Sequence, residues 1–78
     1  MEVIADILRL GEAGKTEIMY SANMSYRQLQ KYLTFLVQQG FLERRVVPNP
    51  GVKYRTTRKG HRLLKSIDTM LDVLGSQG

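Results

Sequence analysis

The hydrophobic residues of the chain recur with a helical period over most of its length and with a strand-like pattern over one shorter stretch. Three segments carry apolar residues three or four positions apart, as the buried face of an amphipathic helix does: 3–10, 25–39 and 57–74. A further, brief helix is expected over 16–20, where Ile18 and Met19 are apolar. Residues 41–47 and 52–56 are β-prone instead, and the second of these runs alternates apolar or aromatic residues with basic ones. The pattern predicts three helices, a hairpin of two strands and a final helix.

Local signals mark where the longer helices begin and end. Ser25 and Gln28 have the spacing of a capping box, in which each side chain binds a free backbone N–H group of the first helical turn. Gly40 stands where a glycine commonly ends a helix, and Thr57 is suited to cap the last helix. The third helix is therefore predicted to begin after Ser25 and to end before Gly40.

The connecting segments are rich in turn-forming residues. Residues 11–14 are expected to be a short connection, after which Thr16 caps the second helix. Asn23 can take a left-handed conformation in the turn before the third helix. Pro50 and Gly51 suit the two central positions of a type II turn at the tip of the hairpin.

Three helices, a two-stranded hairpin and a further helix are the order of a winged helix-turn-helix domain. An isolated hairpin of two strands is not stable in water, so the strands must pack against the helices. A chain of 78 residues can bury one small hydrophobic core but not two. We therefore predict a single domain over residues 1–78, of the α+β class and mostly α, in which the hairpin forms the wing.

The charges change this picture, because they are unevenly distributed. The formal net charge is +5, yet residues 27–65 hold ten Lys or Arg residues and one acidic residue, Glu43. The segments on either side of this block carry a net negative charge. Proteins usually achieve solubility with mixed charges, whereas a block of one sign points to an anionic partner. Nucleic acid is the commonest large anionic partner.

The composition also excludes several classes of chemistry. There is no cysteine, which removes disulfides, thiolate zinc sites and thiol nucleophiles. The single histidine, His61, lies among basic residues rather than in a catalytic or metal-binding group. The run from Gly11 to Thr16 resembles a phosphate-binding loop but lacks its spacing. We expect no enzymatic activity, no metal and no cofactor. No apolar stretch has the length of a membrane span, and the first residues do not have the order of a signal peptide.

Several runs of residues also carry a family resemblance. Five pieces of the chain resemble, in order, the archaeal winged helix-turn-helix DNA-binding family: Lys15–Tyr20, Ala22–Tyr26, Leu29–Leu36, Gln39–Glu43 and Tyr54–Gly60. The last piece looks like the strand-to-helix junction of these proteins, with Tyr54, Thr57 and Gly60 in a Y-x-x-T-x-x-G pattern. The resemblance implies DNA binding, usually as a dimer, in small transcription regulators or chromatin-type proteins, some of which dimerise through a C-terminal helix.

The third helix holds the first set of candidate DNA-binding residues. In a helix-turn-helix motif the second helix enters the major groove, with its N-terminal residues nearest the bases. Here that helix begins at Ser25, and Arg27 is suited to a bidentate contact with guanine. Gln28 is suited to adenine but also to the capping box, and Lys31 to a phosphate. Tyr26 either donates its hydroxyl to a phosphate or packs beside the apolar stripe of its helix.

The hairpin and the start of the last helix hold the second set. Arg44 and Arg45 lie on one strand, Lys53 and Arg55 on the other, and Arg58 lies just beyond. A basic wing of this kind would reach a neighbouring groove or the DNA backbone. The alternative is that these charges keep an edge hairpin soluble.

The last helix carries an apolar face broad enough for two tasks. It must cover the core of the domain, and it is also expected to supply a dimer interface, which we place on five residues: Leu63, Ile67, Met70, Leu71 and Leu74.

These expectations converge on a double-stranded DNA-binding protein, a transcription regulator or small chromatin protein, acting as a homodimer. Its expected location is the cytoplasm, in association with the nucleoid. A winged-helix module for protein–protein contacts within a larger complex fits the same fold, because fold does not fix function. RNA binding is less favoured, since the tyrosines are expected mostly near core positions rather than on an exposed stacking platform.

Overall fold

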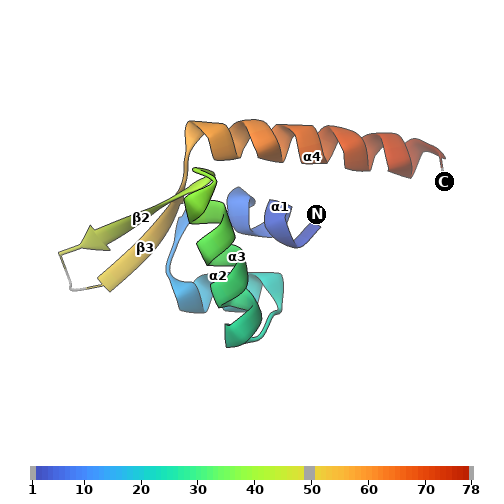
Figure 1. The fold of residues 1–78 in the computed structure, drawn as a ribbon. Helices are drawn as coiled ribbons and strands as arrows, with labels where there is room; N and C mark the ends of the chain where they lie inside the picture. Colours follow the sequence, from blue (N-terminus) through green and yellow to red (C-terminus); the bar gives the residue numbers. More distant parts are fainter. Residues whose placement is uncertain (1, 49–50, 78) are drawn as a thin grey trace.

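The computed structural model describes residues 2–48 and 51–77, which form four helices and a three-stranded antiparallel sheet. In chain order the elements are α1 (Glu2–Arg9), β1 (Glu12–Ala13), α2 (Lys15–Ala22), α3 (Tyr26–Gln38), β2 (Leu42–Val47), β3 (Gly51–Thr56) and α4 (Arg58–Gln77). The strands are arranged in the order β1-β3-β2. Figure 1 shows α1, α2 and α3 gathered under the first half of α4, with the β2–β3 hairpin projecting from one side. The predicted winged helix-turn-helix order is confirmed.

A single hydrophobic core joins the helices to the sheet. Its largest fully buried side chains come from all four helices: Leu8, Ile18, Leu29, Leu36 and Ile67. Tyr54 of β3 and Leu42 of β2 belong to one cluster with the leucines and the isoleucine that α1, α2 and α3 contribute to this set. Burying each such aliphatic side chain stabilises the fold by about 1.5–3 kcal/mol relative to exposure. The core therefore fixes the position of α3 relative to the hairpin, which are the two elements that carry the candidate site.

The ends of α3 follow the sequence signals. The Ser25 hydroxyl accepts a hydrogen bond from the Gln28 backbone N–H at 3.2 Å, and the Gln28 side-chain oxygen accepts one from the Ser25 N–H at 3.1 Å. At the other end Gly40 has a φ of 80°, a left-handed conformation that glycine adopts without strain. The Phe41 N–H donates to the Leu36 carbonyl at 2.8 Å, which closes the helix end. Asn23, in the turn before α3, is also left-handed, with a φ of 51°.

One strand was not predicted. Residues 11–14 were expected to form only a connection, but Glu12 and Ala13 pair with Arg55 and Tyr54 of β3 as strand β1. The Thr56 N–H also donates to the Gly11 carbonyl at 2.7 Å. Two residues are too few to show an alternating pattern, and the free edge of β3 decides their conformation.

The start of α2 also differs from the prediction. Its N-cap is Gly14 rather than Thr16, and the Glu17 carboxylate accepts a hydrogen bond from the Gly14 N–H at 3.5 Å. Thr16 lies inside the first turn. The type II turn was expected to have Pro50 and Gly51 at its centre; Pro50 lies outside the described residues, and Gly51 is the first residue of β3.

The first turn of α4 is fastened to the end of α3. The Thr57 hydroxyl donates to the Gly40 carbonyl at 2.6 Å and accepts from the Gly60 N–H at 3.0 Å, so Thr57 caps α4 as predicted. Gly60 is buried against Phe41, and a methyl group at this position would lie 2.2 Å from the Phe41 carbonyl oxygen. Lys59 adds a hydrogen bond to the Gln39 carbonyl at 2.7 Å. The Y-x-x-T-x-x-G junction is therefore a close backbone contact between α4 and the C-terminal end of α3.

The second half of α4 extends beyond the rest of the molecule (Figure 1). Hydrophobic side chains remain exposed along it, including Met70, Val73 and Leu74. In the part of the chain that the structure describes, no helix combines the length and apolar character that a membrane span requires.

Candidate nucleic-acid interface

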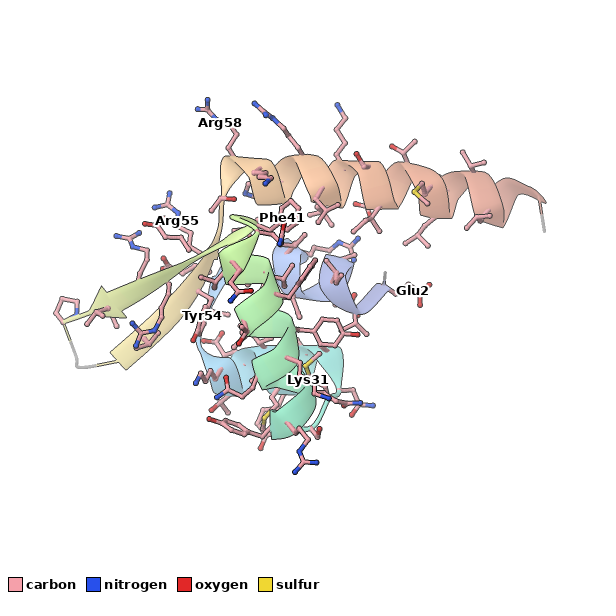
Figure 2. The ribbon with its side chains drawn as sticks, in the orientation of Figure 1. Glu2, Lys31, Phe41, Tyr54, Arg55 and Arg58 are labelled. Atoms are coloured by element: carbon pink, nitrogen blue, oxygen red, sulfur yellow. The ribbon has the colours of Figure 1, made fainter. Side chains whose placement is uncertain are left out.

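The exposed side of α3 presents a row of polar and basic side chains. Leu29, Leu33 and Leu36 point into the core. On the opposite side lie four exposed residues at intervals of four, three and four: Arg27, Lys31, Thr34 and Gln38. We call this row the α3 face, and Figure 2 shows Lys31 on it. Arg27 and Lys31 are predicted site residues, and Thr34 and Gln38 complete the row as the helical period places them.

Capping already engages two of the predicted site residues. Ser25 and Gln28 bind each other's backbone N–H groups, so the Gln28 oxygen is occupied at the end of the helix. A bidentate contact with adenine needs both the oxygen and the nitrogen of the amide. Of the two roles that the sequence allowed for Gln28, the structure contains the capping role.

Tyr26 lies on the surface rather than in the core, with 56% of its area exposed. Its hydroxyl accepts a hydrogen bond from the Gln30 side-chain amide at 2.9 Å, and the Lys15 ammonium lies 5.7 Å from the centre of its ring. The hydroxyl proton remains available for another acceptor. Tyr20 is also exposed, so the expectation that the tyrosines lie near core positions is wrong for both residues.

The register of the hairpin divides the basic residues of the wing between two faces. Arg44 pairs with Tyr54, and the neighbouring Arg45 pairs with Lys53. Neighbouring pairs along a strand point to opposite faces of the sheet. Tyr54 is buried in the core, and Arg44 lines with it a shallow hollow of about 210 Å³ beside Leu33 and Thr34 of α3. Arg44 therefore lies on the same side of the sheet as α3.

Val46 is a further residue on the α3 side of the wing. It pairs with Val52, two positions beyond Arg44 on the same face, and 74% of its area is exposed. Val46 was not among the predicted site residues, although the two-residue period of a strand places it with Arg44.

Arg45, Lys53 and Arg55 lie on the other face of the sheet, away from α3. On this side an open hollow of about 620 Å³ separates the sheet from the start of α4. Its lining includes three of the predicted basic residues, Arg45, Arg55 and Arg58, together with Glu12 and His61. The Arg45 guanidinium lies 3.6 Å from the Glu12 carboxylate, and both side chains remain partly exposed. Figure 2 shows Arg55 and Arg58 far from Lys31 of the α3 face.

The five residues predicted for the dimer interface differ in how exposed they are. Ile67 is only 1% exposed and belongs to the core of its own chain, so it is unavailable to a second copy, which corrects the expectation for this residue. Leu63 and Leu71 are half-buried against the domain. Met70 and Leu74 are exposed, at 49% and 62% of their areas, and Val73 joins them.

The residues that the structure describes include no group of three or more His, Asp or Glu side chains that could hold a metal ion.

The comparison with protein families agrees with the fold. A family model described as winged helix-turn-helix matches residues 1–75. The chain belongs to this winged helix-turn-helix family. Within it, α2 and α3 form the helix-turn-helix and the β2–β3 hairpin forms the wing.

Two individual proteins resemble this winged helix-turn-helix chain over nearly its whole length. A protein of Methanocaldococcus jannaschii, described as uncharacterized, is 34% identical over an alignment of 79 residues. The alignment covers 97% of this chain and 76% of that protein. The solved structure of Sso10a-2, described as a DNA-binding protein from Sulfolobus solfataricus, superposes with a TM-score of 0.87. It is 32% identical, and the match covers 97% of this chain and 81% of that one. Both relatives are archaeal, as the sequence resemblance implied.

Proposed function

We propose that this winged helix-turn-helix chain binds double-stranded DNA, with α3 in the major groove and the hairpin as a wing. The observation that carries the proposal is the α3 face, whose two cations, Arg27 and Lys31, are exposed at the N-terminal half of the motif's second helix. Neither forms an ion pair with another described residue. The similarity to a solved protein described as DNA-binding supports the same partner.

Each residue of the α3 face has a role that its chemistry suits. The major groove is about 12 Å wide and admits an α-helix. Arg27, near the start of α3, would form the bidentate contact with guanine, and Lys31, one turn further, would contact a phosphate. Tyr26 would donate its free hydroxyl proton to a second phosphate. Gln28 keeps its place in the capping box and does not read a base.

The wing would contact the same duplex through its α3 side. Arg44 lies on that side beside α3, and Val46 follows it towards the tip. A basic side chain at this position suits the backbone next to the groove that α3 occupies. An exposed valine near the tip suits the sugar and base edges of a neighbouring minor groove.

The exposed side of α4 would join two copies of the chain. Met70, Val73 and Leu74 lie together on the half of α4 that projects from the domain, and a second α4 would remove them from water. A homodimer would present two α3 faces, as pairs of half-sites require. Sedimentation equilibrium tests this part: twice the mass of the 8.9 kDa chain is expected, and a monomer across the micromolar range would contradict it.

The cellular role would follow from how strongly the protein prefers one sequence. A transcription regulator binds its site about 10³–10⁷ times more tightly than random DNA, whereas a chromatin protein has little preference. Either role would place the protein on the nucleoid in the cytoplasm. Affinity for a duplex selected from a random pool, compared with a scrambled duplex across a salt series, separates the two roles.

The test of DNA binding uses variants of the α3 face. The double variant Arg27→Ala, Lys31→Ala is expected to lose the sequence-preferred complex, because it loses both the guanine contact and one phosphate contact. The matched control, Arg27→Lys, keeps the charge but loses the bidentate geometry. It should keep the salt slope and lose about 1–3 kcal/mol of preference. Unchanged preference in the double variant would contradict the role of the α3 face, and no binding of any duplex by the wild-type protein at low salt would favour a protein-interaction module instead.

A further inference from the structure

We propose that this protein has a second DNA-binding surface, which holds the phosphate backbone of a DNA segment other than the one on the α3 face. The surface consists of the basic residues around the 620 Å³ hollow and their continuation along α4: Arg45, Arg55, Arg58, His61, Arg62 and Lys65. We call it the outer basic surface. The proposal rests on the proposed function for the kind of partner, but not for the position of the site.

The first observation is the direction in which the hollow faces. It lies between the start of α4 and the side of the sheet that carries Arg45 and Arg55. Arg44 and Tyr54 point the other way, towards α3. The sheet therefore stands between the hollow and α3, and Figure 2 shows Arg58 and Lys31 at opposite ends of the domain. A duplex seated on α3 leaves this surface open.

The second observation is a row of cations along α4. Arg58, Arg62 and Lys65 follow one another at intervals of four and three residues, so they share one side of the helix. All three are exposed, and none forms an ion pair with another described residue. The row begins at the hollow and extends it by about 10 Å, the length of seven helical residues at 1.5 Å each. The hollow and the row therefore form one continuous surface.

The third observation is the balance of charge. Five Lys or Arg residues belong to the outer basic surface, whereas α3 and the side of the wing next to it carry three, with Lys15 of α2 beside Tyr26 as a fourth: Arg27, Lys31, Arg44 and Lys15. Two carboxylates share the outer face of the sheet, since Glu12 contacts Arg45 and Glu43 stands opposite Arg55 in the strand register. They neutralise only part of the positive charge. A one-sided excess of this kind fits an anionic partner better than a solvated surface, where the signs are usually mixed.

The shape of the surface favours a DNA backbone over a small phosphate compound. The hollow is open, and its arginine side chains are exposed rather than enclosed around one point. Phosphates of one DNA strand are spaced by about 3.4 Å along the helix axis, so a row of about 10 Å spans about three of them. Extended contact of this type neutralises charge without reading sequence.

The test counts DNA duplexes per chain. At low salt and saturating DNA, titration with a short duplex of one turn is expected to reach two duplexes per protomer, whether the protein is monomeric or dimeric. The variant Arg62→Gln, Lys65→Gln should bind one duplex per protomer. If a second duplex still binds weakly to this variant, its log K should fall less steeply with log salt than the second step of the wild type does. The slope should be smaller in magnitude by about 1.8, because two phosphate contacts are lost. The matched control Arg62→Lys, Lys65→Arg keeps both charges and should still bind two.

The remaining outcomes separate this proposal from the proposed function. The variant Arg27→Ala, Lys31→Ala should retain one duplex per protomer, bound without sequence preference. If that variant still binds two, the α3 site is wrong but the outer surface stands. One duplex per wild-type protomer, unchanged by Arg62→Gln, Lys65→Gln, would overturn the second surface alone. Binding of inorganic pyrophosphate at the outer surface, without a second duplex, would assign it to small phosphate compounds and overturn it as a DNA site.

Discussion

The α3 face and the outer basic surface carry similar cations, but the structure holds the two sets of side chains very differently. The helix beneath the α3 face is fixed at both ends, by the capping box of Ser25 and by the contact between Gly40 and Thr57, and its apolar side is in the core. The outer surface joins exposed side chains of a sheet and a helix, and among the described residues its one ion pair joins Arg45 to Glu12. A fixed helix can hold an arginine in the geometry that a base edge requires, whereas loosely held cations respond to charge alone. The comparison therefore predicts one sequence-reading surface and one backbone-binding surface.

The largest expected effect comes from breaking the contact that supports the α3 face. In the variant Gly60→Ala the new methyl group would lie 2.2 Å from the Phe41 carbonyl oxygen and 2.9 Å from Thr56 Cγ2, so the backbone must shift. We expect the free energy of unfolding in urea to fall by about 3 kcal/mol. Gly75→Ala is the matched control, because nothing lies within 4 Å of that position, and its stability should stay the same or rise by up to about 1 kcal/mol. Equal stabilities for the two variants would contradict the close contact.

A smaller effect is expected from the other end of α3. Ser25→Ala removes the hydroxyl that accepts the Gln28 N–H, and we expect a loss of about 1 kcal/mol in the free energy of unfolding. The partner variant Gln28→Ala should also lower stability, since it removes the reciprocal bond to the Ser25 N–H. Its preference among duplexes should remain that of the wild type. A change in that preference at an adenine position would show that Gln28 reads a base.

The smallest effect is also the sharpest comparison, because it uses two neighbouring arginines. Arg44→Ala should weaken binding of the first, sequence-preferred duplex and lower its salt slope by about 0.9, because Arg44 lies on the α3 side. Arg45→Ala should leave that duplex unaffected and weaken only the second one. Thermal unfolding should change little for either exposed residue. The same effect of both variants on the first duplex would show that one DNA segment contacts both faces of the wing.

Much of the fold could be predicted from the sequence, since its signals are local. The capping box of Ser25, the glycine at the end of α3 and the cap at Thr57 depend on residues within a few positions of each other. Strand β1 could not be predicted, because its conformation is set by β3, some forty residues further along the chain. Gly60 showed no local signal for its close approach to Phe41 beyond the family pattern.

The candidate site could be predicted as a set of residues but not as an arrangement. The basic block was visible from the charges, and the helical period placed Arg27 and Lys31 on one side of α3. The division of the wing needed the strand register, which pairs Arg45 with Lys53 and turns both away from α3. The predicted dimer interface of α4 could not be placed from spacing alone either. Ile67 fits the helical spacing of that interface, but the structure buries it in the core of its own chain.

The proposal that α3 reads the major groove is tested most directly by changing one atom of the DNA. Replacing the guanines of the selected duplex by 7-deazaguanine removes the N7 acceptor that a bidentate arginine requires. The wild-type protein should lose about 1–3 kcal/mol of binding free energy on this change, and the Arg27→Ala variant, which has no such contact, should lose none. Equal affinity of the wild-type protein for the two duplexes would contradict the account.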